Sequence, residues 1–198
     1  MIPTLPLRLR NRLAETILRA LHDPAARRQL ERLATDPATA AHWLEDAARE
    51  QGPLLRERAR RAGEALAGRP PIAAEPSLDE AVAAAATLFD AGLHFEVHEL
   101  LEPHWIRAEG RAREALQGLI QIAVGYQHLA NGNLPGARAL LTEGARRLRA
   151  GRLAELDLAT FAADVADTIP KLTDAALPAV PLFPRNAGRC SSACEKEA

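Results

Sequence analysis

Cysteine is almost absent from this chain of 198 residues, which contains only Cys190 and Cys194. Two thiols cannot complete a tetrahedral zinc site, so a self-contained cysteine zinc centre is excluded. The pair remains compatible with a redox couple or with two ligands of a metal shared between chains. We favour a simpler interpretation, in which residues 176–198 form a flexible tail in a reducing compartment.

Long apolar runs are also missing. No uninterrupted apolar stretch approaches the roughly 20 residues that a membrane span requires. The N-terminus carries Arg8 and Arg10 ahead of a charged helical pattern and lacks the apolar centre of a secretory signal. We therefore expect a soluble, cytoplasmic protein with no membrane partner.

The chain lacks a charge excess of either sign. Its 25 basic and 26 acidic residues give a net charge of −1, and the two signs are interspersed. Such a chain has no overall field that would attract nucleic acid, so we expect no nucleic-acid partner. The arginine runs at 56–61 and 146–149 are interpreted as solvated helix faces. Composition leaves open a homo-oligomer and a protein partner.

The sequence is rich in helix signals, and 47% of its residues are hydrophobic, enough for a sizeable core. Asp23 and Asp36 each precede a proline, as an N-cap precedes the first helical residue, and Ser77 with Glu80 forms a capping box. No alternating strand pattern is visible, which indicates an all-α protein. The predicted helices span about 7–22, 24–35, 37–50, 53–67, 78–91, 94–109, 112–130, 135–149 and 158–168.

Prolines divide the chain. The segment 69–76 contains three of them and is predicted to be a linker. It separates an N-terminal helical region (1–68) from a multi-helical bundle (77–175). Two helices of the bundle, joined by a tight turn at 131–133, resemble the antiparallel pair of a tetratricopeptide repeat. No second copy follows at a 34-residue period, so we restrict this resemblance to the geometry of the helix pair.

The most informative segment, residues 95–105, places acids, histidines and a tryptophan in a predicted buried helix. His94, His98, Glu102 and Trp105 share one stripe, and Glu99 lies beside it. Pro103 removes a donor to the Glu99 carbonyl, which predicts a kink and a free acceptor there.

The following helix is apolar on most of its surface but carries three polar residues on one stripe. We expect these to face the first stripe, because buried polar groups need partners. The predicted pocket comprises seven side chains: His98, Glu99, Glu102, Trp105, Gln117, Gln121 and His128.

These residues carry a family resemblance. The pattern Phe-Glu-x-His-Glu-x-x-Glu-x-x-Trp at 95–105 is followed by Leu-Gln-Gly-Leu-Ile-Gln-x-Ala at 116–123. His128 and the Gly-Asn-x-x-Gly-Ala pattern at 132–137 complete the order. The chain thus resembles domain-of-unknown-function family 309 over about residues 80–150. The resemblance implies a small helical domain with its candidate site in these motifs, and it brings no established activity.

Three interpretations of the site compete. In the first, His98, Glu102 and His128 bind a divalent metal and leave a coordination position open. In the second, a metal-free pocket binds a small molecule, with Glu99 or Glu102 as a base, His98 as a proton shuttle and Trp105 as an apolar wall. In the third, the polar network only fixes helix register, and the protein is a non-enzymatic scaffold for protein partners. The sequence does not decide whether a reaction is catalysed.

Overall fold

The computed structural model describes residues 4–44, 46–149, 151–153, 156–173 and 178–185. Helices dominate this part of the chain, which confirms the all-α class. The two cysteines of the predicted tail lie outside the described residues.

The elements are α1 (Leu7–Ala20), α2 (Pro24–Thr35), α3 (Pro37–Trp43), the 3₁₀ helix η1 (Asp46–Gln51), α4 (Gly52–Leu66), α5 (Leu78–Asp90), α6 (His94–Arg107), α7 (Gly110–Ala130), α8 (Leu134–Leu148), β1 (Arg152–Leu153), β2 (Leu156–Asp157), α9 (Ala159–Thr168) and η2 (Ile169–Lys171).

The predicted helix starts are confirmed by their hydrogen bonds. The side chain of Asp23 accepts from the backbone N–H of the second residue of α2, and Asp36 accepts from two N–H groups of α3. Ser77 and Glu80 form the reciprocal capping box of α5. Each cap satisfies backbone donors that the first helical turn leaves free.

The predicted continuous helix at 37–50 is wrong. The α-helix ends at Trp43, Leu44 has an extended backbone, and a 3₁₀ helix follows. Successive helical residues point about 100° apart, whereas the extended Leu44 allows both Trp43 and Leu44 to pack against the core. The chain also contains a two-stranded antiparallel ladder in which Leu153 pairs with Leu156.

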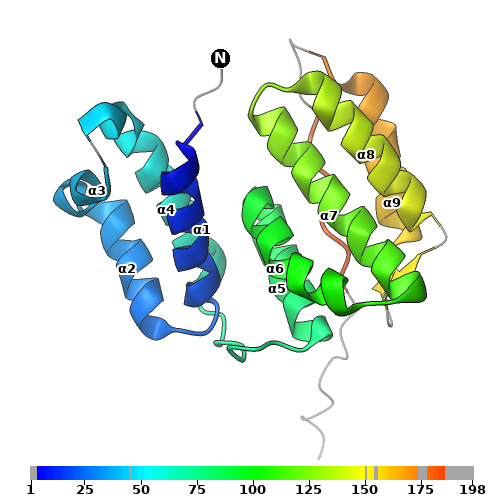
Figure 1. The fold of residues 1–198 in the computed structure, drawn as a ribbon, viewed down its shortest axis with the longest axis horizontal. Helices are drawn as coiled ribbons and strands as arrows, with labels where there is room; N and C mark the ends of the chain where they lie inside the picture. Colours follow the sequence, from blue (N-terminus) through cyan, green and yellow to red (C-terminus); the bar gives the residue numbers. More distant parts are fainter. Residues whose placement is uncertain (1–3, 45, 150, 154–155, 174–177, 186–198) are drawn as a thin grey trace, which may run out of the picture.

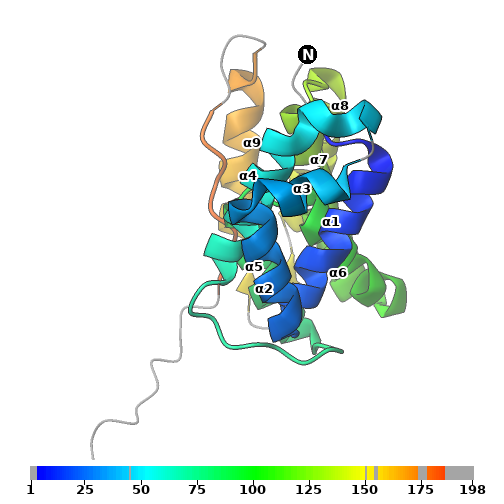
Figure 2. The same cartoon turned by 90° about the vertical axis from the view of Figure 1, so that its left-hand side faces the viewer.

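Helices α5 and α6 lie between two groups of helices, α1–α4 on one side and α7–α9 on the other (Figure 1). The view from the side of α1–α4 shows these helices in front of α5 and α6 (Figure 2). Helices α7 and α8 pack closely because Gly118 and Gly144 face each other. A Cβ atom on Gly118 would lie 2.6 Å from Leu148 Cδ2, and one on Gly144 would lie 2.8 Å from the Gly118 carbonyl oxygen.

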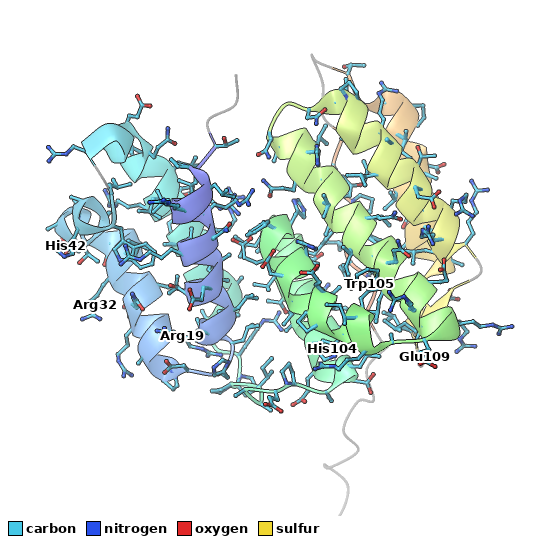
Figure 3. The ribbon with its side chains drawn as sticks, viewed as in Figure 1. Arg19, Arg32, His42, His104, Trp105 and Glu109 are labelled. Carbon is cyan, nitrogen blue, oxygen red and sulfur yellow. The ribbon has the colours of Figure 1, made fainter. Side chains whose placement is uncertain are left out.

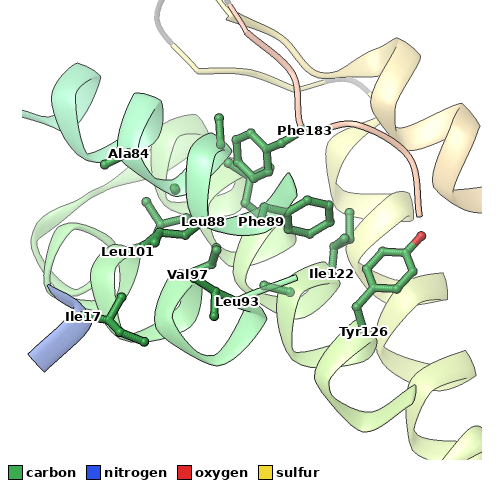
Figure 4. Packing of buried hydrophobic residues seen from close by; sticks show 14 of the residues in the cluster. Ile17, Ala84, Leu88, Phe89, Leu93, Val97, Leu101, Ile122, Tyr126 and Phe183 are labelled. Carbon is green, nitrogen blue, oxygen red and sulfur yellow. The ribbon is translucent and has the colours of Figure 1, made fainter. Parts of the chain in front are cut away.

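One hydrophobic cluster extends across both groups of helices. Ile17 of α1 packs beside Val97 and Leu101 of α6, and Phe89 and Ile122 continue the cluster toward α7 (Figure 4). The N-terminal helices therefore share their core with the helices that carry the candidate site. Within the described residues, no helix has both the length and the apolarity needed to cross a bilayer.

Candidate functional site

The site is built on α6, which is fixed at both ends. Before it, Gly92 has a φ of +71°, a conformation that glycine adopts without the cost of a Cβ clash. After it, Nη1 of Arg113 donates to the carbonyls of Trp105, Ile106 and Ala108 at 3.2–3.3 Å. Arg113 thus satisfies carbonyl groups that the last helical turn leaves free.

Three predicted site residues converge on α6. Nδ1 of His98 lies 3.2 Å from a carboxylate oxygen of Glu99, and Nε2 lies 3.8 Å from one of Glu102. One donor atom from each residue lies within 4.8 Å of the other two. The side chains are 27%, 38% and 43% exposed, respectively. The imidazole is thus placed between two carboxylates in a position that solvent and solutes can reach.

The face of α6 toward α4 holds an ion pair that sequence reasoning missed. Glu96 is fully buried, and both of its carboxylate oxygens lie 3.2 Å from Nη2 of Arg58. Arg58 is only 17% exposed, so the interpretation of the 56–61 run as a solvated face is wrong at this position. Periodicity offered a signal for Arg58, which follows the buried Leu55 by three residues on α4 and therefore lies near the same face.

A second histidine of α6 is buried among aromatic rings. The His94 ring centroid lies 4.9 Å from that of Phe89 and 5.4 Å from that of Tyr126. Its Nε2 is buried and has no hydrogen-bond partner among the described residues. Burial, together with the charges of Arg58 and Arg61, lowers the pKa of His94 to about 4, so its imidazole is neutral at neutral pH.

The alignment of α6 along α7 shows which residues of α6 lie level with Gln117 and Gln121. The Arg113 guanidinium lies 4.5 Å from the Trp105 ring centroid, and the Tyr126 ring lies beside His94. These two contacts define an antiparallel pair, in which Gln121 is level with His98 and Gln117 with Glu102. Oε1 of Gln121 and Nε1 of Trp105 are buried and have no hydrogen-bond partner among the described residues.

His128 lies outside the convergent group. Its Nδ1 is 2.7 Å from the Asn133 side-chain nitrogen, and the Asn133 side-chain oxygen accepts from the Gly136 N–H. In the same register, His128 lies beyond the N-terminal end of α6. The structure therefore joins His128 to the α7–α8 turn, and it is Glu99 that joins His98 and Glu102.

Pro103 lies inside α6, as predicted, and the helix continues past it to Arg107. The missing N–H leaves the Glu99 carbonyl without its usual helical donor. The predicted kink stays a prediction. Pro103 and Glu99 also line a groove between α1 and α6, whereas His98 and Glu102 do not, so Glu99 is the residue that joins the convergent group to this groove.

Comparison with known proteins supports the motif assignment. Residues 82–140 match the model of a family described as "Domain of unknown function (DUF309)", which confirms the predicted resemblance. No curated protein and no solved structure matches the chain. The matched segment includes the convergent residues and Glu96, whereas Arg58 and the whole of α1–α4 lie outside it.

Proposed function

We propose that this protein binds a divalent cation on α6 through His98, Glu99 and Glu102. The observation that supports the proposal is the convergence of three donor atoms within 4.8 Å of one another. An imidazole and two carboxylates form a ligand set that suits Zn²⁺, Mn²⁺ or Fe²⁺. Because three protein ligands leave coordination positions open, the bound cation would accept water or a further ligand.

Stability alone does not account for the cluster. All three side chains are more than a quarter exposed, and ion pairs exposed to solvent contribute about 0–1 kcal/mol. The buried pair of Glu96 and Arg58 already connects α6 to α4. A purely structural network is therefore the weaker alternative, and cation binding gives the three donors a function that their energetics do not.

The test is a calorimetric titration of Mn²⁺ and Zn²⁺ into tag-free protein, with bound metal measured by mass spectrometry. We expect one cation per chain. The substitutions His98→Ala and Glu102→Ala should each weaken binding at least tenfold, because each removes a ligand, and even changes to residues that only orient a ligand cost 10- to 100-fold.

Glu109→Ala is the matched control. Glu109 is an exposed acid two residues after the end of α6 and is not part of the convergent group. Glu109→Ala removes one negative charge, as Glu102→Ala does, and should leave the affinity for the cation unchanged. Wild-type protein that binds neither cation, or that binds as well after His98→Ala as before it, would contradict the proposal.

A further inference from the structure

The groove beside Glu99 has the size of a small-molecule site. It lies between α1 and α6, is bordered by residues 72–76, and has a volume of about 720 Å³. Sites for small ligands typically have volumes of about 300–1,000 Å³ and are often found where two structural units meet. This groove lies where the N-terminal helices meet the family-matched segment.

The walls of the groove are held in place by a backbone hydrogen bond between two of its lining residues and by the hydrophobic core. The Ile72 N–H donates to the Leu21 carbonyl at 3.0 Å, which fixes the connecting segment against the end of α1. Ile17 packs against α6 in the hydrophobic core (Figure 4). A ligand would therefore enter a preformed groove and would not need to order it, which reduces the entropic cost of binding.

The α6 wall has a polar residue at each end and apolar residues between them. Glu99, Pro103 and Arg107 line the groove and follow at intervals of four residues, so they share one face of the helix. With a rise of 1.5 Å per residue, Glu99 and Arg107 are about 12 Å apart along the axis. Leu100 of α6 and Leu18 of α1 supply apolar surface between these ends.

Arg107 is the positively charged side chain that is available at the end of the groove farthest from Glu99. Arg19 also lines the groove, but its side chain is shared with Asp23 at 3.8 Å and with Gln29 at 3.4 Å. Arg107 forms no ion pair with any residue that the structure describes. Figure 3 shows Arg19 on α1 and His104 on α6 at the same end of the molecule.

The charges of the groove define the ligand. Glu15 and Glu75 line it together with Glu99, so an anion is repelled unless a positive charge offsets them. Arg107 offers one such charge, and a cation bound by Glu99 offers the second.

We propose that the groove binds linear dicarboxylates of medium chain length. One carboxylate coordinates the cation at Glu99, the other pairs with Arg107, and the methylene chain lies on the apolar surface between them. This inference rests on the proposed cation site for one of its two ends. Arginine is well suited to the second end, because its guanidinium binds a carboxylate with two parallel hydrogen bonds.

The test uses three acids, each titrated into the full-length protein with and without Mn²⁺. Azelate has a carboxylate at each end of a chain that roughly spans the two positions. Succinate has the same ends on a shorter chain, and nonanoate has a similar chain with one end. We expect azelate to bind the Mn²⁺-loaded protein at least tenfold more tightly than either of the other acids.

Two variants test the contributions of the two ends of the groove separately. Arg107→Gln should weaken azelate binding at least tenfold and leave Mn²⁺ binding unchanged, whereas His98→Ala should weaken both. The control is Arg111→Gln, which removes the same charge from an exposed position on α7 outside the groove and should alter neither.

The outcomes also separate this inference from the proposed function. If Mn²⁺ binds but azelate binds no better than nonanoate, or Arg107→Gln has no effect on azelate, the groove proposal is overturned and the cation site stands. If azelate binding depends on Arg107 in protein that binds no cation, the cation site is refuted. The assignment of one azelate carboxylate to a cation at Glu99 is then overturned as well.

Discussion

Glu96 and Glu102 are the same residue type on the same helix, and their surroundings are opposite. Glu96 is fully buried and paired with Arg58, whereas the Glu102 side chain is 43% exposed beside His98. A buried carboxylate that loses its partner leaves an uncompensated charge, so it is tied to the fold. An exposed carboxylate costs the fold little when it changes partner. Burial therefore distinguishes an acid that holds the helices together from one that is free to bind a ligand.

The two histidines of α6 repeat this contrast. His94 lies among aromatic rings with a pKa lowered to about 4, whereas His98 is 27% exposed between two carboxylates. One turn of the helix separates them. They lie on the same side of α6, and the difference is in what covers them. Aromatic rings surround His94, whereas the His98 side chain stays open to solvent.

The largest expected effect comes from breaking the buried pair. Glu96→Ala should lower the free energy of unfolding by about 3–5 kcal/mol, because Arg58 would remain with little access to water and without its carboxylate. Urea denaturation measures the change. The double variant Glu96→Leu/Arg58→Met removes both charges and should recover much of the loss. An equal loss in single and double variants would show that packing, and not charge, matters here.

An intermediate effect is expected from His94. Its unfolded-state pKa is near 6.5 and its folded-state pKa is about 4, so between these values the unfolded state binds more protons. The free energy of unfolding should therefore fall as the pH is lowered from 6.5 to 4, by about 3 kcal/mol from this group, and then level off. Acidic residues titrate in the same range, so the informative quantity is the difference between wild type and His94→Leu across the pH series. A constant difference would contradict the assignment.

The smallest expected effect is on the exposed face. His98→Ala and Glu102→Ala should each change the free energy of unfolding by less than about 1 kcal/mol, since exposed pairs contribute little. The same urea experiment, run without metal, provides the measurement. A loss comparable to that of Glu96→Ala would remove the distinction between the two faces and favour a structural network.

Local signals predicted much of the fold. Asp23, Asp36 and Ser77 cap helices where their sequence context indicated, because a cap depends on residues within one turn. The helix at 37–50 failed because tertiary packing of Trp43 and Leu44 overrode the local pattern. Helix periodicity also placed His98, Glu99 and Glu102 together, since their spacing on α6 is itself local.

The remainder of the site depends on contacts between distant parts of the chain. Arg58 and Glu96 are 38 residues apart, and nothing near either residue identifies its partner. The groove requires α1 and α6 to lie together, which no motif encodes. The sequence grouped His128 with the α6 residues, whereas the structure places it beside Asn133. A stripe on α7 indicates a direction, but it does not indicate how far α6 extends beside it.

The connection between α4 and α5 has a consequence for assembly. Residues 67–77 lie outside any regular helix or strand, and the Leu21–Ile72 hydrogen bond attaches this segment to the end of α1. If two chains exchanged their N-terminal helices, the ion pair and the shared core would both be preserved, and the connection alone would change its path. Such an exchange of identical elements between two chains is domain swapping. In a swapped dimer, each groove would have one wall from each chain.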